Sequence, residues 1–191
     1  LAKIIMIQNE PDLLARVKSF IKGEVKNAAE ALQGARDIIA EWVNENEGAR
    51  NAVRNSFAHT GIISSKVIKG KEEEGAKYRD YFDFSEPLNR CSSHRLLALR
   101  RGEAEGILRV SISPDVDTTL DRLKRRFVKG NSEVSDQVAN AVDDSFKRLL
   151  KPSIETEYAN LSKTKADEEA IRVFAENLRQ LLLAPPLGQK R

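Results

Sequence analysis

The sequence predicts a mainly α fold, in which a multi-helical domain carries a small antiparallel β element near its middle. Apolar side chains recur at helical spacing before about residue 60 and again after residue 114. Between these regions, two β-branched segments near 62–68 and 107–112 have the pattern of strands. We therefore expect a helical segment over residues 1–60 and a β/helix insertion over 61–113. A second helical segment over 114–184 closes the same domain, and residues 185–191 form a linker to a further domain.

Capping signals delimit the helices of the first segment. Asn27 followed by Glu30 has the spacing of an N-cap and its reciprocal acid. The helix that it opens is expected to extend to about Asn46. A break near Gly48 then precedes another helix, which continues to His59.

The inserted β element begins where the periodicity changes after residue 60. The two strand candidates can pair in an antiparallel manner, with residues 70–101 as the excursion between them. That excursion contains a lysine–triglutamate run and a set of aromatic residues: Tyr78, Tyr81, Phe82 and Phe84. Such a cluster favours a packing plug that fixes an irregular segment. Stacking on unpaired bases is the alternative, because charged residues alternate with the rings.

After Pro114 the chain is helical again. Apolar stripes at helical spacing indicate two helices before Pro152, which permits a new helix start. Ile154, Tyr158 and Leu161 suit the inner face of that next helix. A last helix is expected over 165–183, ended by a proline pair.

Composition narrows the class of protein. Hydrophobic residues make up 40% of the 191 residues and charged residues 32%, which is typical of a charge-rich globular protein. No run of 18 apolar residues predicts a membrane-spanning helix, and the N-terminal residues do not resemble a signal peptide. The single Cys91 excludes an internal disulfide and is compatible with the cytoplasm, the location that we expect. The absence of an initiator Met predicts a fragment of a longer protein.

The net charge of +3 permits nucleic-acid binding without requiring it, so local clusters must carry that argument. The first cluster surrounds a helix that begins near Ser92 or Ser93, either of which can cap it. Free N–H groups in a first helical turn can bind an anion, and the arginine fork suits phosphate oxygens. The candidate contact residues of this cluster are Arg90, His94, Arg95, Arg100 and Arg101. The alternative is that these arginines pair with nearby glutamates.

A second basic cluster lies on the helix after Pro114. Its candidate contact residues are Arg122, Arg125 and Arg126, with Lys124 and Lys129 beside them. Leu120, Leu123 and Phe127 occupy the opposite side of the helix, so the basic side is expected to face solvent. An ordinary solvated helix face is the alternative interpretation.

Enzymatic interpretations are weaker. Asp80, Asp83 and Glu86 are three residues apart and could meet on one helical turn, but no histidine is adjacent. Cys91 and His94 have the residue types of a thiol–imidazole pair without a signal for an oxyanion hole. No phosphate-binding glycine loop is present. We expect no catalytic residue, no metal, no cofactor and no small-molecule substrate.

Three ordered blocks resemble the bacterial Tex family of transcription accessory proteins. They read QGARDIIAEW, GKEEEGAKYRDYFD with SHRLLALRRGEAEG, and EEAIRVFAENLRQLLLAPP. The resemblance implies a multi-domain helical scaffold with helix-turn-helix character, in which this chain precedes an RNase-H-like domain. It also implies nucleic-acid binding in transcription without established catalysis. The usual binding modules of the family lie beyond this chain, so no family binding residue is carried over.

Two functions follow as hypotheses. In the first, the chain is a helical scaffold that contributes to RNA or DNA binding by the full-length protein, in contact with the transcription machinery. In the second, it is a purely structural or protein-interaction scaffold, which predicts paired arginines and an exposed apolar patch. Neither hypothesis involves a membrane.

Overall fold

The computed structural model describes residues 1–183, and the linker expected at 185–191 lies outside them. The fold divides into two compact units. Unit 1 comprises residues 1–62 and 113–156, and unit 2 comprises residues 63–112 together with the chain from Glu157 onward. The expected mainly α fold with a small antiparallel sheet is confirmed.

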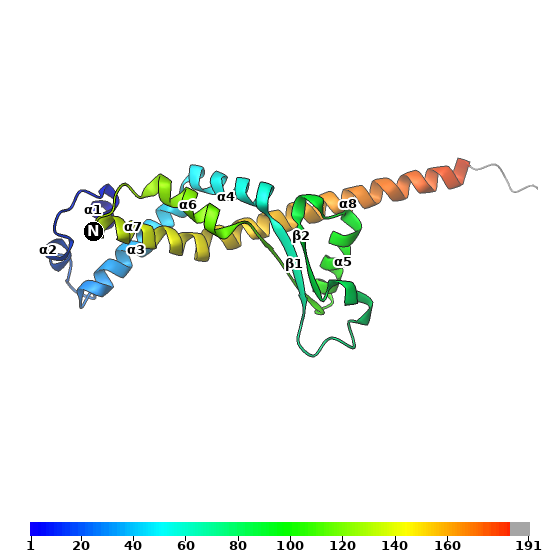
Figure 1. Ribbon diagram of the computed structural model, residues 1–191, viewed down its shortest axis with the longest axis horizontal. Helices are drawn as coiled ribbons and strands as arrows, with labels where there is room; N and C mark the ends of the chain where they lie inside the picture. The colour runs from blue at the N-terminus through cyan, green and yellow to red at the C-terminus, as the bar shows by residue number, and fades with distance from the viewer. Residues whose placement is uncertain (184–191) are drawn as a thin grey trace, which may run out of the picture. The chain divides into compact units, whose positions relative to one another are not determined.

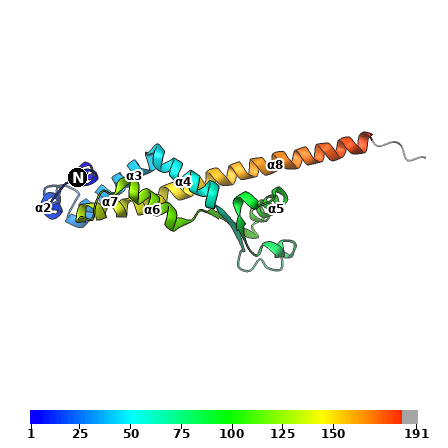
Figure 2. The same ribbon diagram turned by 45° about the horizontal axis from the view of Figure 1, so that its top comes forward.

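Unit 1 is built from helices. Its elements are α1 (Ala2–Ile7), α2 (Leu13–Lys18), α3 (Ala28–Glu45), α4 (Glu47–Thr60), α6 (Val116–Phe127), α7 (Glu133–Asp144), the π-helical turn η3 (Ser145–Leu150) and the first residues of α8 (Lys151–Leu183). The long helices α3, α4, α6 and α7 lie against one another in both views (Figure 1 and Figure 2). Their apolar stripes meet in a core that includes Ile39, Val43, Phe57, Leu123 and Val142.

Side-chain caps set the helix boundaries of unit 1. The Asn27 side chain accepts a hydrogen bond from the Glu30 N–H at 2.9 Å, which confirms the expected start of α3. The break between α3 and α4 falls at Asn46, two residues before the position expected at Gly48. The physical reason is a second cap, because Asn46 accepts from the Ala49 N–H at 3.0 Å and starts a new helix there.

Unit 2 contains the sheet, whose strands are β1 (Ile62–Val67), β2 (Asp83–Pro87) and β3 (Leu108–Ser113) in the order β2-β1-β3. The strands expected near 62–68 and 107–112 are therefore confirmed. The excursion between them supplies the third strand, β2, and also the elements η1 (Ala76–Tyr81), η2 (Leu88–Arg90) and α5 (Ser93–Ala104).

The aromatic excursion packs around Tyr78, which is buried. Its ring lies beside Gly102 of α5, where a methyl group would come within 2.7 Å of Leu108 Cδ1. Only a glycine allows α5 to approach the sheet and Tyr78 this closely. The structure therefore favours the packing plug over base stacking for Tyr78.

The helix α8 is longer than the sequence pattern indicates. It runs from Lys151 to Leu183 without interruption at Pro152 or before Lys165, so the two helices expected there form one. Pro152 is tolerated because it follows the π-helical turn η3, where the regular pairing of the backbone is already broken. Leu161, expected on an inner face, is 57% exposed.

Candidate nucleic-acid interface

The predicted contact residues fall on two separate surfaces. Arg122, Arg125 and Arg126 belong to α6 in unit 1. The others belong to η2 and α5 in unit 2: Arg90, His94, Arg95, Arg100 and Arg101. Each surface is therefore described within its own unit.

The α6 surface consists of three exposed arginines on one side of the helix. Arg122, Arg125 and Arg126 are three and four residues apart, so they share a face, while Leu123 and Phe127 are buried on the other. Within residues 1–183, none of the three arginines forms an ion pair or a side-chain hydrogen bond. Arg122 also lies near enough to the Asp115 carboxylate to help lower its pKa, after the hydrogen bonds from Thr118.

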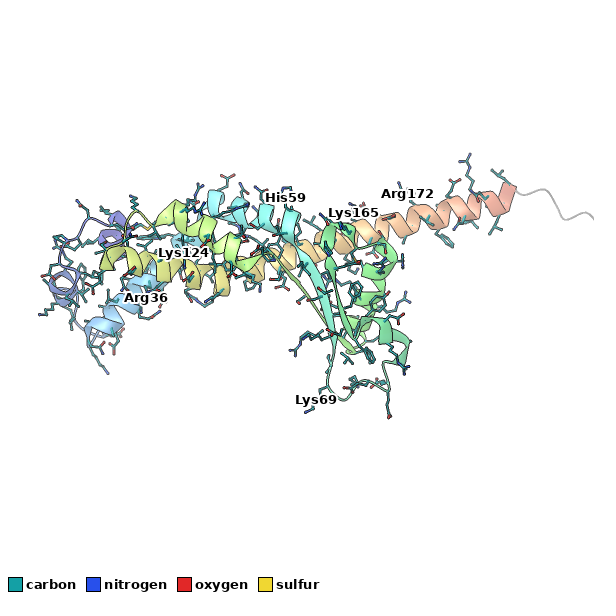
Figure 3. The ribbon with its side chains drawn as sticks, in the orientation of Figure 1. Arg36, His59, Lys69, Lys124, Lys165 and Arg172 are labelled. Carbon is teal, nitrogen blue, oxygen red and sulfur yellow. The ribbon has the colours of Figure 1, made fainter. Side chains whose placement is uncertain are left out.

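The neighbours of these arginines define the limits of the surface. Lys124, labelled in Figure 3, pairs with Asp143 of α7 at 2.9 Å and is not free. The Arg126 guanidinium lies directly over Gly48 at the start of α4, where a side chain would collide with it. The helix itself is capped by Asp115, whose pKa is lowered because its carboxylate accepts the backbone N–H of Thr118. The α6 surface thus extends toward the first turn of α4.

The α5 surface is different, because part of its charge is used internally. Arg95 pairs with Glu86 of β2 at 2.6 Å, and Arg100 pairs with Glu103 at 2.8 Å. The Arg100 side chain is only 12% exposed, so it is poorly placed to meet a large ligand. Arg90, His94 and Arg101 are exposed. The predicted cluster is therefore divided between internal pairs and accessible residues.

The start of α5 differs from the expected anion site. Ser92 is the N-cap residue, but its hydroxyl caps no N–H group, and its oxygen is buried without a partner. The Ser93 hydroxyl donates a hydrogen bond to Glu169 of α8. A carboxylate this close to the first turn opposes the approach of a phosphate. Sequence reasoning missed Glu169 because 76 residues separate it from Ser93.

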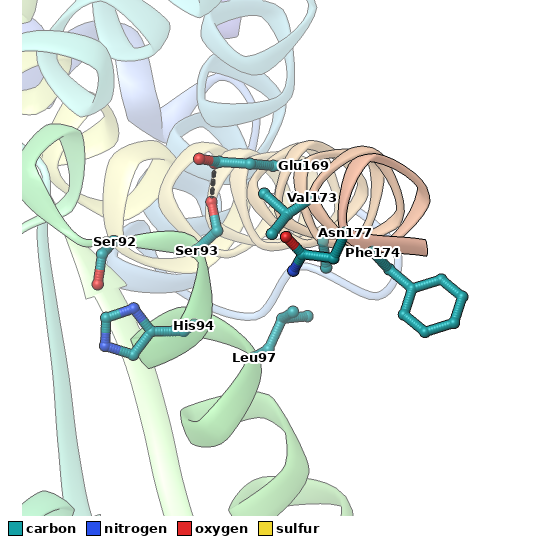
Figure 4. Close-up of a pocket in the computed structure, with 9 residues that line it drawn as sticks. Ser92, Ser93, His94, Leu97, Glu169, Val173, Phe174 and Asn177 are labelled. Carbon is teal, nitrogen blue, oxygen red and sulfur yellow. Dashed lines mark hydrogen bonds between the residues drawn. The ribbon is translucent and has the colours of Figure 1, made fainter. Parts of the chain in front are cut away.

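A groove runs between α5 and α8 (Figure 4). Its walls include Leu97 of α5 together with Val173 and Phe174 of α8, and Ser93 and Glu169 close one end. Phe174 is 69% exposed, although phenylalanine is usually buried. Further exposed apolar residues follow along α8: Ile171, Leu178, Leu181, Leu182 and Leu183. The second hypothesis predicts an exposed apolar patch without naming its residues, and these residues of α8 form one.

The interpretations that involve catalysis find little geometric basis. Burial, followed by the neighbouring Glu86 carboxylate, raises the pKa of the Cys91 thiol to about 12, which leaves almost no thiolate at neutral pH. Asp83 and Glu86 do not share a helical turn, because both lie in β2, where residues three apart point to opposite faces. Within residues 1–183, no group of three His, Cys, Asp or Glu residues is placed to hold a metal ion. No helix in that part of the chain combines the length and apolar character needed to cross a membrane.

Relatives of this chain include proteins named for transcription and for RNA. The chain is 34% identical to Protein tex of Bordetella pertussis over 206 residues, covering 100% of this chain and 26% of the relative. It is 33% identical to Transcriptional accessory protein Tex of Neisseria gonorrhoeae, covering 99% of this chain and 26% of the relative. It is 27% identical to S1 RNA-binding domain-containing protein 1 of Homo sapiens, covering 93% of this chain and 19% of the relative.

The chain thus spans about a quarter of the length of its bacterial relatives. A family model described as Tex central region-like matches residues 8–174, which include most of each unit and both basic surfaces. The resemblance of the three sequence blocks is confirmed by this match. Because the family model covers most of the sequence, the chain belongs to the Tex family.

Proposed function

We propose that this chain is a helical scaffold that contributes a nucleic-acid contact surface to a longer transcription accessory protein. The observation that carries the proposal is the α6 surface, where Arg122, Arg125 and Arg126 are exposed, share a face and lack partners within residues 1–183. The names of two relatives, one a transcriptional accessory protein and one containing an S1 RNA-binding domain, support the same role. The cytoplasm is the compartment that fits it.

The arrangement suits phosphate oxygens better than base edges. Guanidinium groups on one helix face can each contact a phosphate, and such contacts release counterions from the nucleic acid. The α6 surface includes no aromatic side chain that could stack on a base. We therefore expect binding with little sequence preference to RNA or DNA, strengthened in the full-length protein by its other modules.

The test is fluorescence anisotropy of the 191-residue chain with labelled single-stranded RNA, single-stranded DNA and duplex DNA at several salt concentrations. The variant Arg122→Gln/Arg125→Gln/Arg126→Gln should weaken binding by at least about tenfold and lower the salt slope for single strands by about two. The matched control is Lys3→Gln/Lys18→Gln/Lys147→Gln, which removes the same charge from exposed positions elsewhere in unit 1. An equal loss of affinity in the two variants would show that only the net charge matters and would refute the α6 surface as the contact site.

The alternative function is a purely structural scaffold, and the apolar surface of α8 favours it. Phe174, Leu178 and Leu181 are three and four residues apart, so they form one stripe on an exposed helix face. A helix with such a stripe normally buries it against another element. In this alternative, the rest of the longer protein covers the stripe, and the chain positions neighbouring domains without touching nucleic acid itself.

The alternative has its own measurement. Binding of a hydrophobic dye to the 191-residue chain should fall in the variant Phe174→Ser/Leu178→Ser, and the same variant should leave nucleic-acid affinity unchanged. A chain that binds no nucleic acid and shows this dye response would support the structural scaffold alone. We also propose that the role is non-catalytic. An enzymatic activity of the purified chain that is lost when Asp80 or Asp83 is substituted would contradict this proposal.

A further inference from the structure

The sheet of unit 2 has one face that its own helix leaves open. Side chains alternate between the two faces of a strand, and Ile63, Leu108 and Ile112 are buried on the face that packs toward α5. The residues between them point the other way. The part of β1 and β3 that belongs to unit 2 contributes Ser64, Lys66, Arg109 and Ser111 to this open face, and Lys66, Arg109 and Ser111 are exposed.

The strand register places two cations side by side on this open face. The Ile68 N–H donates to the Ile107 carbonyl oxygen at 2.8 Å, so residue 68 lies opposite residue 107 in an antiparallel pair. Two residues further along each strand from this pair, Lys66 therefore lies opposite Arg109. Like charges directly opposite each other on neighbouring strands destabilise a sheet. Within the described residues, neither cation forms an ion pair or a side-chain hydrogen bond that would offset this repulsion.

The next row of the open face carries a pair of hydroxyls. Ser64 lies opposite Ser111, and their Oγ atoms are 3.0 Å apart, so one hydroxyl donates to the other. The hydroxyl that accepts keeps its own proton, which it can donate outward. The two rows together offer an ammonium, a guanidinium and a hydroxyl donor over a patch about 7 Å long. An anion with several oxygens can accept from all three.

One carboxylate limits the site. The Val67 N–H donates to the Phe82 carbonyl oxygen at 3.0 Å, which places Asp83 of β2 opposite Lys66 on the side away from Arg109. Asp83 is exposed and points to the same open face. Its negative charge repels an anion that approaches Lys66, so it gives the site a residue whose removal should strengthen binding.

We propose that this open face, formed by Lys66, Arg109 and the Ser64–Ser111 hydroxyl pair, binds the phosphodiester backbone of a nucleic acid. The inference rests on the proposed function and adds a second contact surface, in unit 2, to the α6 surface of unit 1. A backbone is the fitting ligand because the face presents exposed cations, and its β1 and β3 residues include no aromatic side chain for stacking. Binding there is independent of base sequence.

The experiment compares three variants of the 191-residue chain with the same labelled single-stranded RNA and duplex DNA. Lys66→Gln/Arg109→Gln should weaken binding by about tenfold and lower the salt slope for single strands by about 1.4, which corresponds to two lost phosphate contacts. Asp83→Asn should strengthen binding about twofold, because it removes the repelling carboxylate. Lys18→Gln/Lys147→Gln removes an equal charge from exposed sites of unit 1 and should have a much smaller effect.

A direct footprint accompanies the affinities. Acetylation of Lys66 by an amine-reactive ester, followed by mass spectrometry, should slow when RNA is bound, while acetylation of Lys147 should not. Inorganic phosphate, added at constant ionic strength, should not displace the RNA. Displacement of the RNA by phosphate would show that the open face binds a free anion, and it would overturn the proposal.

The remaining outcomes separate the two proposals. If the parent chain binds RNA but Lys66→Gln/Arg109→Gln behaves like its lysine control, the open face is not a contact surface. The α6 surface is then tested separately by the Arg122→Gln/Arg125→Gln/Arg126→Gln variant. If the parent chain binds none of the nucleic acids, both proposals are refuted. Circular dichroism of each variant confirms that a loss of affinity is not a loss of folding.

Discussion

The arginines of α6 and those of α5 have similar sequence surroundings but different structural roles. On α6, Arg122, Arg125 and Arg126 remain unpaired within residues 1–183, because the helix turns them away from its buried side. On α5, Arg95 and Arg100 form ion pairs with Glu86 and Glu103. The difference teaches that a basic cluster in a sequence does not by itself indicate a binding surface. What decides is whether the fold brings carboxylates within reach of it.

The units also differ in how their polar groups are satisfied. In unit 1 the helices meet through apolar stripes, and buried hydroxyls donate to backbone carbonyls. Ser145, for example, donates to the Ala40 carbonyl oxygen at 2.7 Å, and Thr119 donates to that of Asp115. In unit 2 the small sheet and α5 are joined by a polar cluster of Glu86, Arg95 and Cys91.

The largest effect concerns Cys91 in that polar cluster. Because its pKa is raised to about 12, far above the ordinary value of a thiol, its reaction with iodoacetamide near pH 8 should be at least about a hundredfold slower than that of a free cysteine. Because the pKa of the Cys91 thiol is higher in the folded chain than in the unfolded chain, its contribution to the free energy of unfolding is fully present below the unfolded-state pKa. This contribution is lost as the pH rises toward 12. Mass spectrometry of the labelled chain over time measures the rate. Rapid labelling of the folded chain would show that the cluster is open.

Glycines in the two units should respond in opposite ways to a methyl group. Gly102→Ala in α5 places a methyl group 2.7 Å from Leu108 Cδ1 and should destabilise unit 2 by about 1–3 kcal/mol. Gly34→Ala in α3 meets no atom within 4 Å and should stabilise unit 1 by up to about 1 kcal/mol, because alanine favours a helix. Urea denaturation monitored by circular dichroism gives both values. Destabilisation by Gly34→Ala would show that α3 is covered on that side.

The two arginine sets should separate in a binding experiment. Arg122→Gln/Arg125→Gln should weaken RNA binding by about tenfold at moderate salt, whereas Arg95→Gln/Arg100→Gln should change it less than about twofold. The physical reason is that the α5 arginines already hold carboxylates, while the α6 arginines do not. Anisotropy titrations with one labelled RNA measure both variants. A larger loss in the α5 variant would reverse the assignment of the contact surface.

The smallest effect concerns the ion pairs themselves. Glu86→Gln should destabilise the chain by about 0.5–1 kcal/mol, because the Glu86 side chain is only 16% exposed and the substitution removes the charged partner of Arg95. The matched control is Glu74→Gln, which breaks the more exposed pair of Lys71 and Glu74 and should have almost no effect. Thermal denaturation compares the two. Equal effects would mean that the Glu86 pair is as solvent-exposed as the Glu74 pair.

The sequence itself determined the helical class, the strands near 62–68 and 107–112, and the cap at Asn27. These features depend on contacts within a few residues, so a local pattern is enough to reveal them. The exposure of the α6 arginines also followed from local pattern, because the apolar stripe of the same helix faces the core.

Only the tertiary structure decided which charged and polar groups distant in the sequence lie next to one another. Arg95 meets Glu86 across a strand and a helix, Ser93 meets Glu169 across 76 residues, and Lys66 meets Arg109 across the sheet. The continuity of α8 through Pro152 likewise depended on the irregular turn that precedes it. Partners distant in the chain come together only when the elements pack. For this reason the composition of a charged cluster indicates candidate residues, and the packing within each unit determines which of their charges are paired.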